Sequence, residues 1–166
     1  MREPLKDKNR LEHMISAIDT ILERTNGLSY DDFVSDKILF GGIVYHTMII
    51  GEAAYKLSEA FVSAHPQVPW RDIADMRHHL VHGYYQVDPE IVWSVIQNDL
   101  LPLHEHVVGY INEIDWQEWE KNYKVVTETA VHKNLVQTAR RMKNDGMDTQ
   151  QIARYTGLTT EEIEEI

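Results

Sequence analysis

The sequence predicts an all-α protein, with a bundle of four main helices followed by a short helical extension at the C-terminus. Apolar residues recur at intervals of three and four along most of the chain, which places them on one face of a helix. No segment alternates apolar and polar residues between the Asn-Gly or Asp-Gly turns of a β-hairpin. Of the 166 residues, 43% are hydrophobic and 26% are charged, a composition typical of globular domains.

The first helix is predicted between Leu11 and Leu22, where the apolar residues form a single stripe. The stripe contains Leu11, Met14, Ile15, Ile18, Ile21 and Leu22. The pair Asn26-Gly27 is suited to the left-handed backbone that ends a helix. Ser29, followed by two aspartates, predicts the start of a short connecting helix.

A long second helix is predicted from about Ser35 to Ala64. Its apolar residues cover several faces, so we expect it at the centre of the bundle. Gly41, Gly42 and Gly51 each lower the helix propensity by about 1 kcal/mol relative to alanine. Glycines within a helix often mark the close approach of a neighbouring backbone. Two prolines between residues 65 and 69 end the helix.

The third and fourth helices complete the predicted bundle. The third runs from Trp70 to Val81 and ends at Gly83, and we expect Trp70, Ile73, Met76 and Leu80 to face inward. The fourth begins after the start signal at residues 88–89, bends at Pro102 and continues to Ile114.

The composition changes after Asp115, which predicts a domain boundary. Residues 1–114 form the bundle, residues 115–128 an amphipathic connector and residues 129–166 an extension of three short helices. Residues 148–166 have the proportions of a helix-turn-helix, but its second helix carries four glutamates and no basic residue. DNA binding is therefore disfavoured, and we expect the extension to pack or to contact a partner.

Charge and composition restrict the partners of the chain. With 27 acidic and 16 basic residues the net charge is −11, so contacts with nucleic acid must be confined to a local site. The absence of cysteine excludes disulfides and thiolate chemistry. The first 13 residues lack the apolar core of a signal peptide, and no window approaches about 18 consecutive apolar residues. We expect a cytoplasmic protein without membrane contact.

The densest group of chemically active side chains lies at the end of the third helix, in the segment Arg77–Tyr85. Arginine presents a planar fork of donors that fits phosphate oxygens, and histidine titrates near neutral pH and can act as general acid or base. Together these groups could cleave RNA without a metal. On an unbroken helix, position 82 lies about 140° around the axis from position 77. The hypothesis therefore requires the chain to loosen near Gly83, so that His82 and Tyr84 turn toward Arg77.

Two other interpretations of the same segment are open. His78 and His82 are four residues apart and could bind zinc together with His46 or Glu52, but no HExxH pattern accompanies them. We predict no metal and no cofactor. The segment could also be a polar network that closes one end of the bundle, with Arg77 paired to a carboxylate.

The residues around this segment resemble the HepT-like branch of the HEPN superfamily. The resemblance lies in the stretch PWRDIADMRHHLVHGY at residues 69–84, in IIGEAA at 49–54 and in LEHM at 11–14, and it covers about residues 8–114. The signature is an arginine, four residues, a histidine, one residue and a tyrosine. The resemblance implies an up-and-down HEPN bundle that forms a homodimer. In many members that dimer is a metal-independent endoribonuclease toxin of a toxin-antitoxin system.

The resemblance also implies roles for individual residues. Arg77 would bind the scissile phosphate, and His82 would be the general acid or base at the ribose 2′-hydroxyl. His78 would supply the polar group that follows the arginine. Tyr84 matches a tyrosine that a nucleotidyltransferase antitoxin modifies with AMP, which would place a phosphate beside Arg77 and silence the site.

One supporting position is kept and one is changed. Glu52 is retained, whereas Tyr45-His46 replaces an arginine-asparagine pair found in many relatives. The predicted function is a metal-independent endoribonuclease toxin that cleaves RNA at a dimer cleft. The alternative is a non-catalytic nucleotide-binding or partner-binding module that works with a nucleotidyltransferase.

Overall fold

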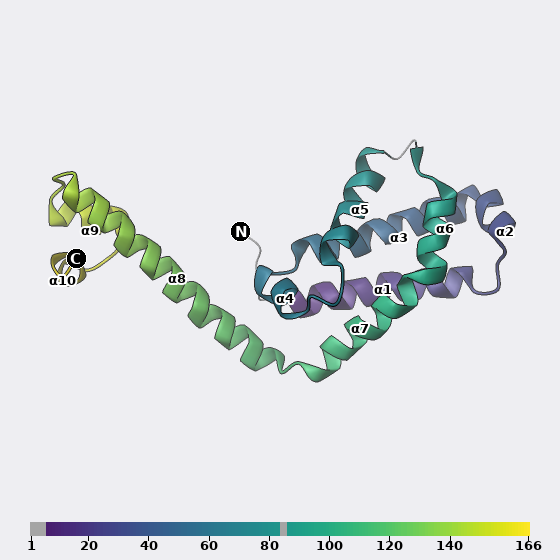
Figure 1. The fold of residues 1–166 in the computed structure, drawn as a ribbon, viewed down its shortest axis with the longest axis horizontal. Coiled ribbons are helices and arrows are strands. Elements are labelled where there is room, and N and C mark those ends of the chain that lie inside the picture. The colour runs from purple at the N-terminus through teal and green to yellow at the C-terminus, as the bar shows by residue number, and fades with distance from the viewer. Residues whose placement is uncertain (1–5, 84–85) are drawn as a thin grey trace. The chain divides into compact units, whose positions relative to one another are not determined.

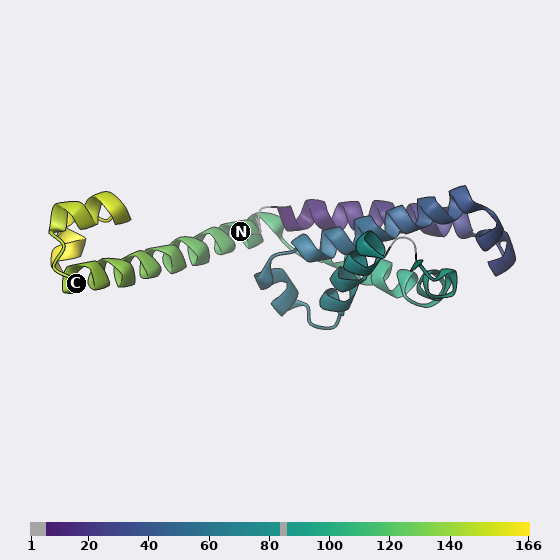
Figure 2. The ribbon, with the colours of Figure 1, turned by 90° about the horizontal axis from the view of Figure 1, so that it is seen from above.

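The computed structural model describes residues 6–83 and 86–166, and every regular element within these ranges is an α-helix (Figures 1 and 2). This confirms the predicted all-α class. The elements are α1 (Asp7–Thr25), α2 (Tyr30–Ser35), α3 (Lys37–Lys56), α4 (Glu59–Ala64), α5 (Trp70–His82), α6 (Pro89–Asn98), α7 (Leu100–Glu113), α8 (Trp116–Asn144), α9 (Thr149–Thr156) and α10 (Thr160–Glu164).

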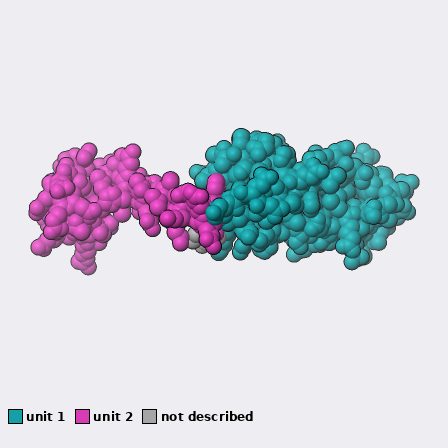
Figure 3. Space-filling model, turned by 90° about the horizontal axis from the view of Figure 1, so that it is seen from below, with its two compact units in different colours: residues 1–116 teal, residues 117–166 magenta. Residues whose placement is uncertain are grey.

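The chain divides into two compact units, an N-terminal unit of residues 1–116 and a C-terminal unit of residues 117–166 (Figure 3). Each unit has a buried apolar core of its own. The candidate site residues predicted from the sequence all belong to the N-terminal unit.

In the N-terminal unit, α1 and α3 lie side by side and run in opposite directions (Figures 1 and 2). Helix α5 packs on α3, and α7 packs on α1. The predicted apolar stripe of the first helix faces the core, where Leu11, Met14, Ile18 and Ile21 are fully buried. The predicted central position of the second helix is confirmed, because α3 lies between α1 and α5.

By length and composition, α3 is the one described helix that passes as a candidate membrane span. The core helix of a soluble bundle passes the same test. Helix α3 packs on α1 and α5, and 33% of its apolar window is buried.

The prediction of one helix from Ser35 to Ala64 was wrong at its C-terminal end. Helix α3 ends at Lys56, and α4 begins at Glu59 with Ser58 as its N-cap. The buried carboxylate of Asp7 accepts hydrogen bonds from the Ser58 backbone nitrogen at 2.9 Å and from its hydroxyl at 2.5 Å. Arg10 pairs with the same carboxylate at 3.2 Å. The Ser58 N–H is therefore directed to a side chain 51 residues away in sequence instead of continuing the helix.

The predicted fourth helix is also two helices. Helix α6 ends at Asn98, α7 begins at Leu100, and Asp99 joins them. The bend expected at Pro102 lies three residues earlier, at Asp99, and α6 and α7 run in different directions (Figure 1). Pro102 has no N–H to donate to the Asn98 carbonyl, so it lies in the first turn of a new helix.

The C-terminal unit is built on the later part of α8, with α9 and α10 folded against it. Residues expected as a connector and as the first short helix form one continuous helix, α8. The core consists of Ala139, Ile152, Leu158 and Ile163. Gly157 makes the turn between α9 and α10 with a φ of 73°. The Lys143 ammonium donates to the carbonyls of Ile163 at 3.0 Å and Glu164 at 3.2 Å, and so caps the end of α10.

The start of α10 contains a capping box whose carboxylate should titrate abnormally. Glu162 accepts hydrogen bonds from the Thr159 backbone N–H at 2.7 Å and from its hydroxyl at 2.9 Å. These bonds lower the pKa of Glu162, the backbone N–H most strongly. Because the folded pKa is depressed, the stabilisation is present above the ordinary carboxyl pKa and is lost as the pH falls through the folded value.

We expect an NMR titration of the side-chain carboxyl carbons to give Glu162 a pKa below the ordinary value of a glutamate side chain. Thr159→Ala should bring the pKa of Glu162 part of the way back, because the backbone N–H remains. An ordinary glutamate pKa for Glu162 in the unaltered protein would show that the capping box does not form in solution.

Candidate active site

The position of α5 on α3 is set by a close contact at Gly51. A Cβ atom on Gly51 would lie 2.5 Å from the Cβ of Arg77 and 3.0 Å from the carbonyl oxygen of Ile73, distances too short for any side chain. The expected close approach of a backbone is therefore confirmed at Gly51. It was wrong for Gly41 and Gly42, where the same added atom would meet nothing within 4 Å.

Next to this contact, Arg77 of α5 forms an ion pair with Glu52 of α3. The Arg77 Nε atom lies 2.6 Å from Glu52 Oε2, which is itself buried. The side chain of Arg77 is 35% exposed, so the pair lies at the surface of the bundle. The contact is an ion pair without hydrogen-bond geometry, because Oε2 accepts no hydrogen bond within the described part of the chain.

Two further residues of α3 complete this cluster. The ring of Tyr55 has its centroid 5.6 Å from Arg77 Cζ, a cation–π contact. The Lys56 ammonium lies 3.7 Å from Glu52 Oε1. Glu52 therefore holds two cations, one on each carboxylate oxygen. The sequence analysis missed both Tyr55 and Lys56, although a separation of three or four residues from Glu52 on a helix is a signal that could have identified them.

The arrangement leaves one edge of the Arg77 guanidinium available. Only Nε is occupied by Glu52, and no ion pair or hydrogen bond joins the two terminal amino groups to residues 6–83 or 86–166. A guanidinium binds phosphate through two parallel N–H donors. Arg77 is thus fixed by one nitrogen while retaining the donors that a phosphate needs.

The other predicted site residues lie at the end of α5. His78 is exposed, and its ring meets the ring of His79 edge-on, with the centroids 6.2 Å apart. Helix α5 ends at Gly83, as predicted, and the Gly83 N–H donates to the His79 carbonyl at 2.8 Å. The side chain of His82 and the whole of Tyr84 lie outside the described part of the chain. Their predicted roles are taken up under Proposed function.

The backbone does not loosen before Gly83. Helix α5 is continuous from Arg77 through His82, so positions 77 and 82 lie about 140° apart around its axis. The sequence analysis required loosening near Gly83 for both groups of one chain to face the same cleft. The expectation was therefore wrong for His82, because the helix continues through this residue and ends only at Gly83.

A metal site needs several ligand side chains around one point. Within the described ranges, no three histidine, aspartate or glutamate side chains lie close enough to hold one ion together. The zinc hypothesis includes His82, whose side chain is not among those described.

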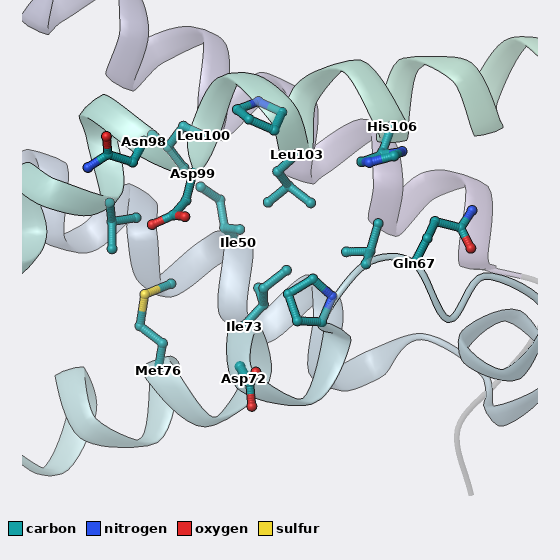
Figure 4. Close-up of a pocket in the computed structure, with 14 residues that line it drawn as sticks. Ile50, Gln67, Asp72, Ile73, Met76, Asn98, Asp99, Leu100, Leu103 and His106 are labelled. Carbon is teal, nitrogen blue, oxygen red and sulfur yellow. The ribbon is translucent and has the colours of Figure 1, made fainter.

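A cavity of about 470 Å³ lies beside α5, between this helix and the junction of α6 and α7 (Figure 4). Ile50, Ile73 and Leu103 point toward its centre, and the carboxylates of Asp72 and Asp99 lie in its wall. Helix α5 therefore has a packed neighbour, α3, on one side and open space on another. The contact with α3 at Gly51 is what positions Arg77.

Comparison with known proteins adds a family to this geometry. The family model described as ribonuclease HepT-like matches residues 14–109, which include Glu52, Arg77 and His82. No solved structure matches the chain significantly.

Curated relatives carry names of the same kind. A protein of Caldanaerobacter subterraneus subsp. tengcongensis, provisionally named an RNase, is 38% identical over 58% of this chain and 87% of its own. A protein of Thermococcus cleftensis, provisionally named the ribonuclease HepT, is 36% identical over 56% of this chain and 84% of its own. A third, from Methanocaldococcus jannaschii and also provisionally named an RNase, is 29% identical over 69% of this chain and 96% of its own.

Proposed function

Because this chain belongs to the HepT-like ribonuclease family, we propose that it is a metal-independent endoribonuclease whose Arg77 binds the phosphate at the cleaved bond. The observation that carries the proposal is the ion pair between Arg77 Nε and Glu52, at 2.6 Å. It holds a partly exposed guanidinium, and within the described ranges no hydrogen bond occupies its terminal donors. Negative charge that develops on the phosphate in the transition state is stabilised by donors already in place.

His82 is the proposed general base and acid. It removes the proton of the ribose 2′-hydroxyl, the 2′-oxygen attacks phosphorus, and the bond to the 5′-oxygen breaks as that oxygen takes up a proton. The products are a 2′,3′-cyclic phosphate and a 5′-hydroxyl. No metal ion is needed to balance this reaction, and His78 supports it as a further polar group beside Arg77.

We propose that the working form is a homodimer. Positions 77 and 82 of one helix are about 140° apart, which disfavours convergence of both groups of one chain on a single phosphate. A second copy placed against the exposed end of α5 supplies the missing group. Sedimentation analysis should then give twice the mass of one chain.

Regulation is proposed to act through Tyr84. Transfer of AMP from ATP to the tyrosine hydroxyl, with release of pyrophosphate, adds a phosphate near Arg77 and competes with RNA for its donors. A nucleotidyltransferase that makes this transfer would be the antitoxin, and this chain the toxin, of a cytoplasmic toxin-antitoxin pair. The net charge of −11 limits nucleic-acid contact to this local site, and the acidic α10 disfavours DNA as a ligand.

The proposal is tested by incubating the purified protein with a mixed RNA pool in EDTA. We expect cleavage, and mass spectrometry should find 2′,3′-cyclic phosphates at the new ends. Ends carrying a 5′-phosphate would contradict the role given to the 2′-hydroxyl. If the pool stays intact and mass spectrometry finds Tyr84 unmodified, the non-catalytic binding module becomes the better interpretation.

A further inference from the structure

An exposed aromatic ring lies directly beside the proposed phosphate site. Tyr55 follows Glu52 by less than one turn of α3, and its ring centroid is 5.6 Å from Arg77 Cζ. The Lys56 ammonium lies 5.7 Å from the same centroid. Even with these neighbours, Tyr55 exposes 43% of its surface.

The position of this ring distinguishes it from other exposed tyrosines. Among the residues whose side chains are described, Tyr45 lies about 15 Å further along α3, at 1.5 Å per residue. Tyr155 belongs to the C-terminal unit. Tyr55 is the exposed aromatic residue placed against Arg77.

A ring in this position has a chemical use in binding RNA. Nucleobases stack on the faces of aromatic side chains such as tyrosine, and an unpaired nucleotide presents its base close to its own phosphate. In duplex RNA the bases are paired and stacked within the helix, so their faces are not available. Because the chain is strongly acidic, long-range attraction of RNA is weak, and short-range contacts must supply the affinity.

We propose that Tyr55 stacks on the base of a nucleotide adjacent to the phosphate held by Arg77, and that the substrate is therefore single-stranded RNA. This inference rests on the proposed ribonuclease function and adds its substrate class. The ring would then contact the base of a nucleotide whose phosphate is bound by the neighbouring guanidinium.

The test uses an RNA oligonucleotide that contains one cleavage site found in the pool, in single-stranded and in duplex form. Tyr55→Leu should raise KM for the single strand by about tenfold, with little change in kcat, while Tyr55→Phe should behave as the unaltered protein. Tyr155→Leu is the matched control, because it removes a tyrosine that is 71% exposed and far from Arg77 in sequence. The duplex should be cleaved poorly by every variant.

A second substrate separates stacking from a merely structural role of the ring. The second substrate is an oligonucleotide that lacks the base next to the cleaved bond. Its affinity for the unaltered protein should equal the affinity of the complete oligonucleotide for Tyr55→Leu. Combining the variant with this substrate should add no further loss, because the contact is then already absent. If Tyr55 only positioned Arg77, the two losses would add and Tyr55→Leu would lower kcat.

The outcomes distinguish the two proposals. Cleavage by the unaltered protein with an unchanged KM for Tyr55→Leu overturns the stacking inference alone. Additive losses, or rapid cleavage of the duplex, also overturn it. Failure of the unaltered protein to cleave any RNA overturns the proposed function, and the stacking inference with it.

Discussion

Replacing Arg77 with alanine is expected to lower kcat for RNA cleavage by about 100- to 1,000-fold, the range found when one preorganised donor to a transition state is removed. The guanidinium is held by Glu52 through Nε, so it needs little reorganisation when negative charge develops on the phosphate. Arg77→Lys should recover only part of the activity, because one ammonium cannot contact Glu52 and also bind two phosphate oxygens. Cleavage is measured at saturating RNA in EDTA.

Arg71→Ala is the matched control for this experiment. Arg71 lies on the same helix, its side chain is 92% exposed, and its nearest acid is Asp75 at 3.8 Å. Its loss should leave kcat unchanged, and the circular dichroism of both alanine variants should equal that of the unaltered protein. A folded Arg77→Ala variant with full activity would contradict the assignment. His82→Ala, the partner variant, should lose activity to a similar extent.

Gly51→Ala is expected to destabilise the N-terminal unit by about 1–3 kcal/mol, the usual cost of adding a methyl group to a filled contact. The new Cβ atom would lie 2.5 Å from the Cβ of Arg77, so α5 must move away from α3. The same movement lengthens the distance between Arg77 and Glu52. The rate of RNA cleavage should therefore fall together with the free energy of unfolding, although Gly51 has no side chain that could contact RNA.

Gly42→Ala gives the opposite expectation on the same helix. An added Cβ on Gly42 meets nothing within 4 Å, so the variant should gain up to about 1 kcal/mol from its higher helix propensity. Urea unfolding followed by tryptophan fluorescence measures both variants, because Trp70 and Trp93 lie in the N-terminal unit. Equal stability of the two variants would show that α3 and α5 are further apart in solution.

The sequence predicted those parts of the fold that depend on local patterns. The stripe on α1 and the stop at Gly83 need only residues a few positions apart, and both are found in the structure. The break at Ser58 could not be predicted in this way. It depends on Asp7, a residue 51 positions away whose carboxylate redirects the Ser58 N–H.

The site shows the same division between local and long-range information. Arg77 was predicted as a site residue from a short motif, and Glu52 from a second motif on another helix. Their separation of 2.6 Å results from packing between α3 and α5, which no periodicity describes. Tyr55 was missed because the sequence does not show that its ring lies beside Arg77 of a different helix.

The separate cores of the two units have an evolutionary consequence. The matched segments make up 84–96% of the relatives' own lengths, so those proteins have little chain left for a unit like residues 117–166. The C-terminal unit closes its own core and caps its last helix through Lys143. A single recombination event near codon 117 could therefore add or remove this unit without interrupting the hydrophobic core of residues 1–116.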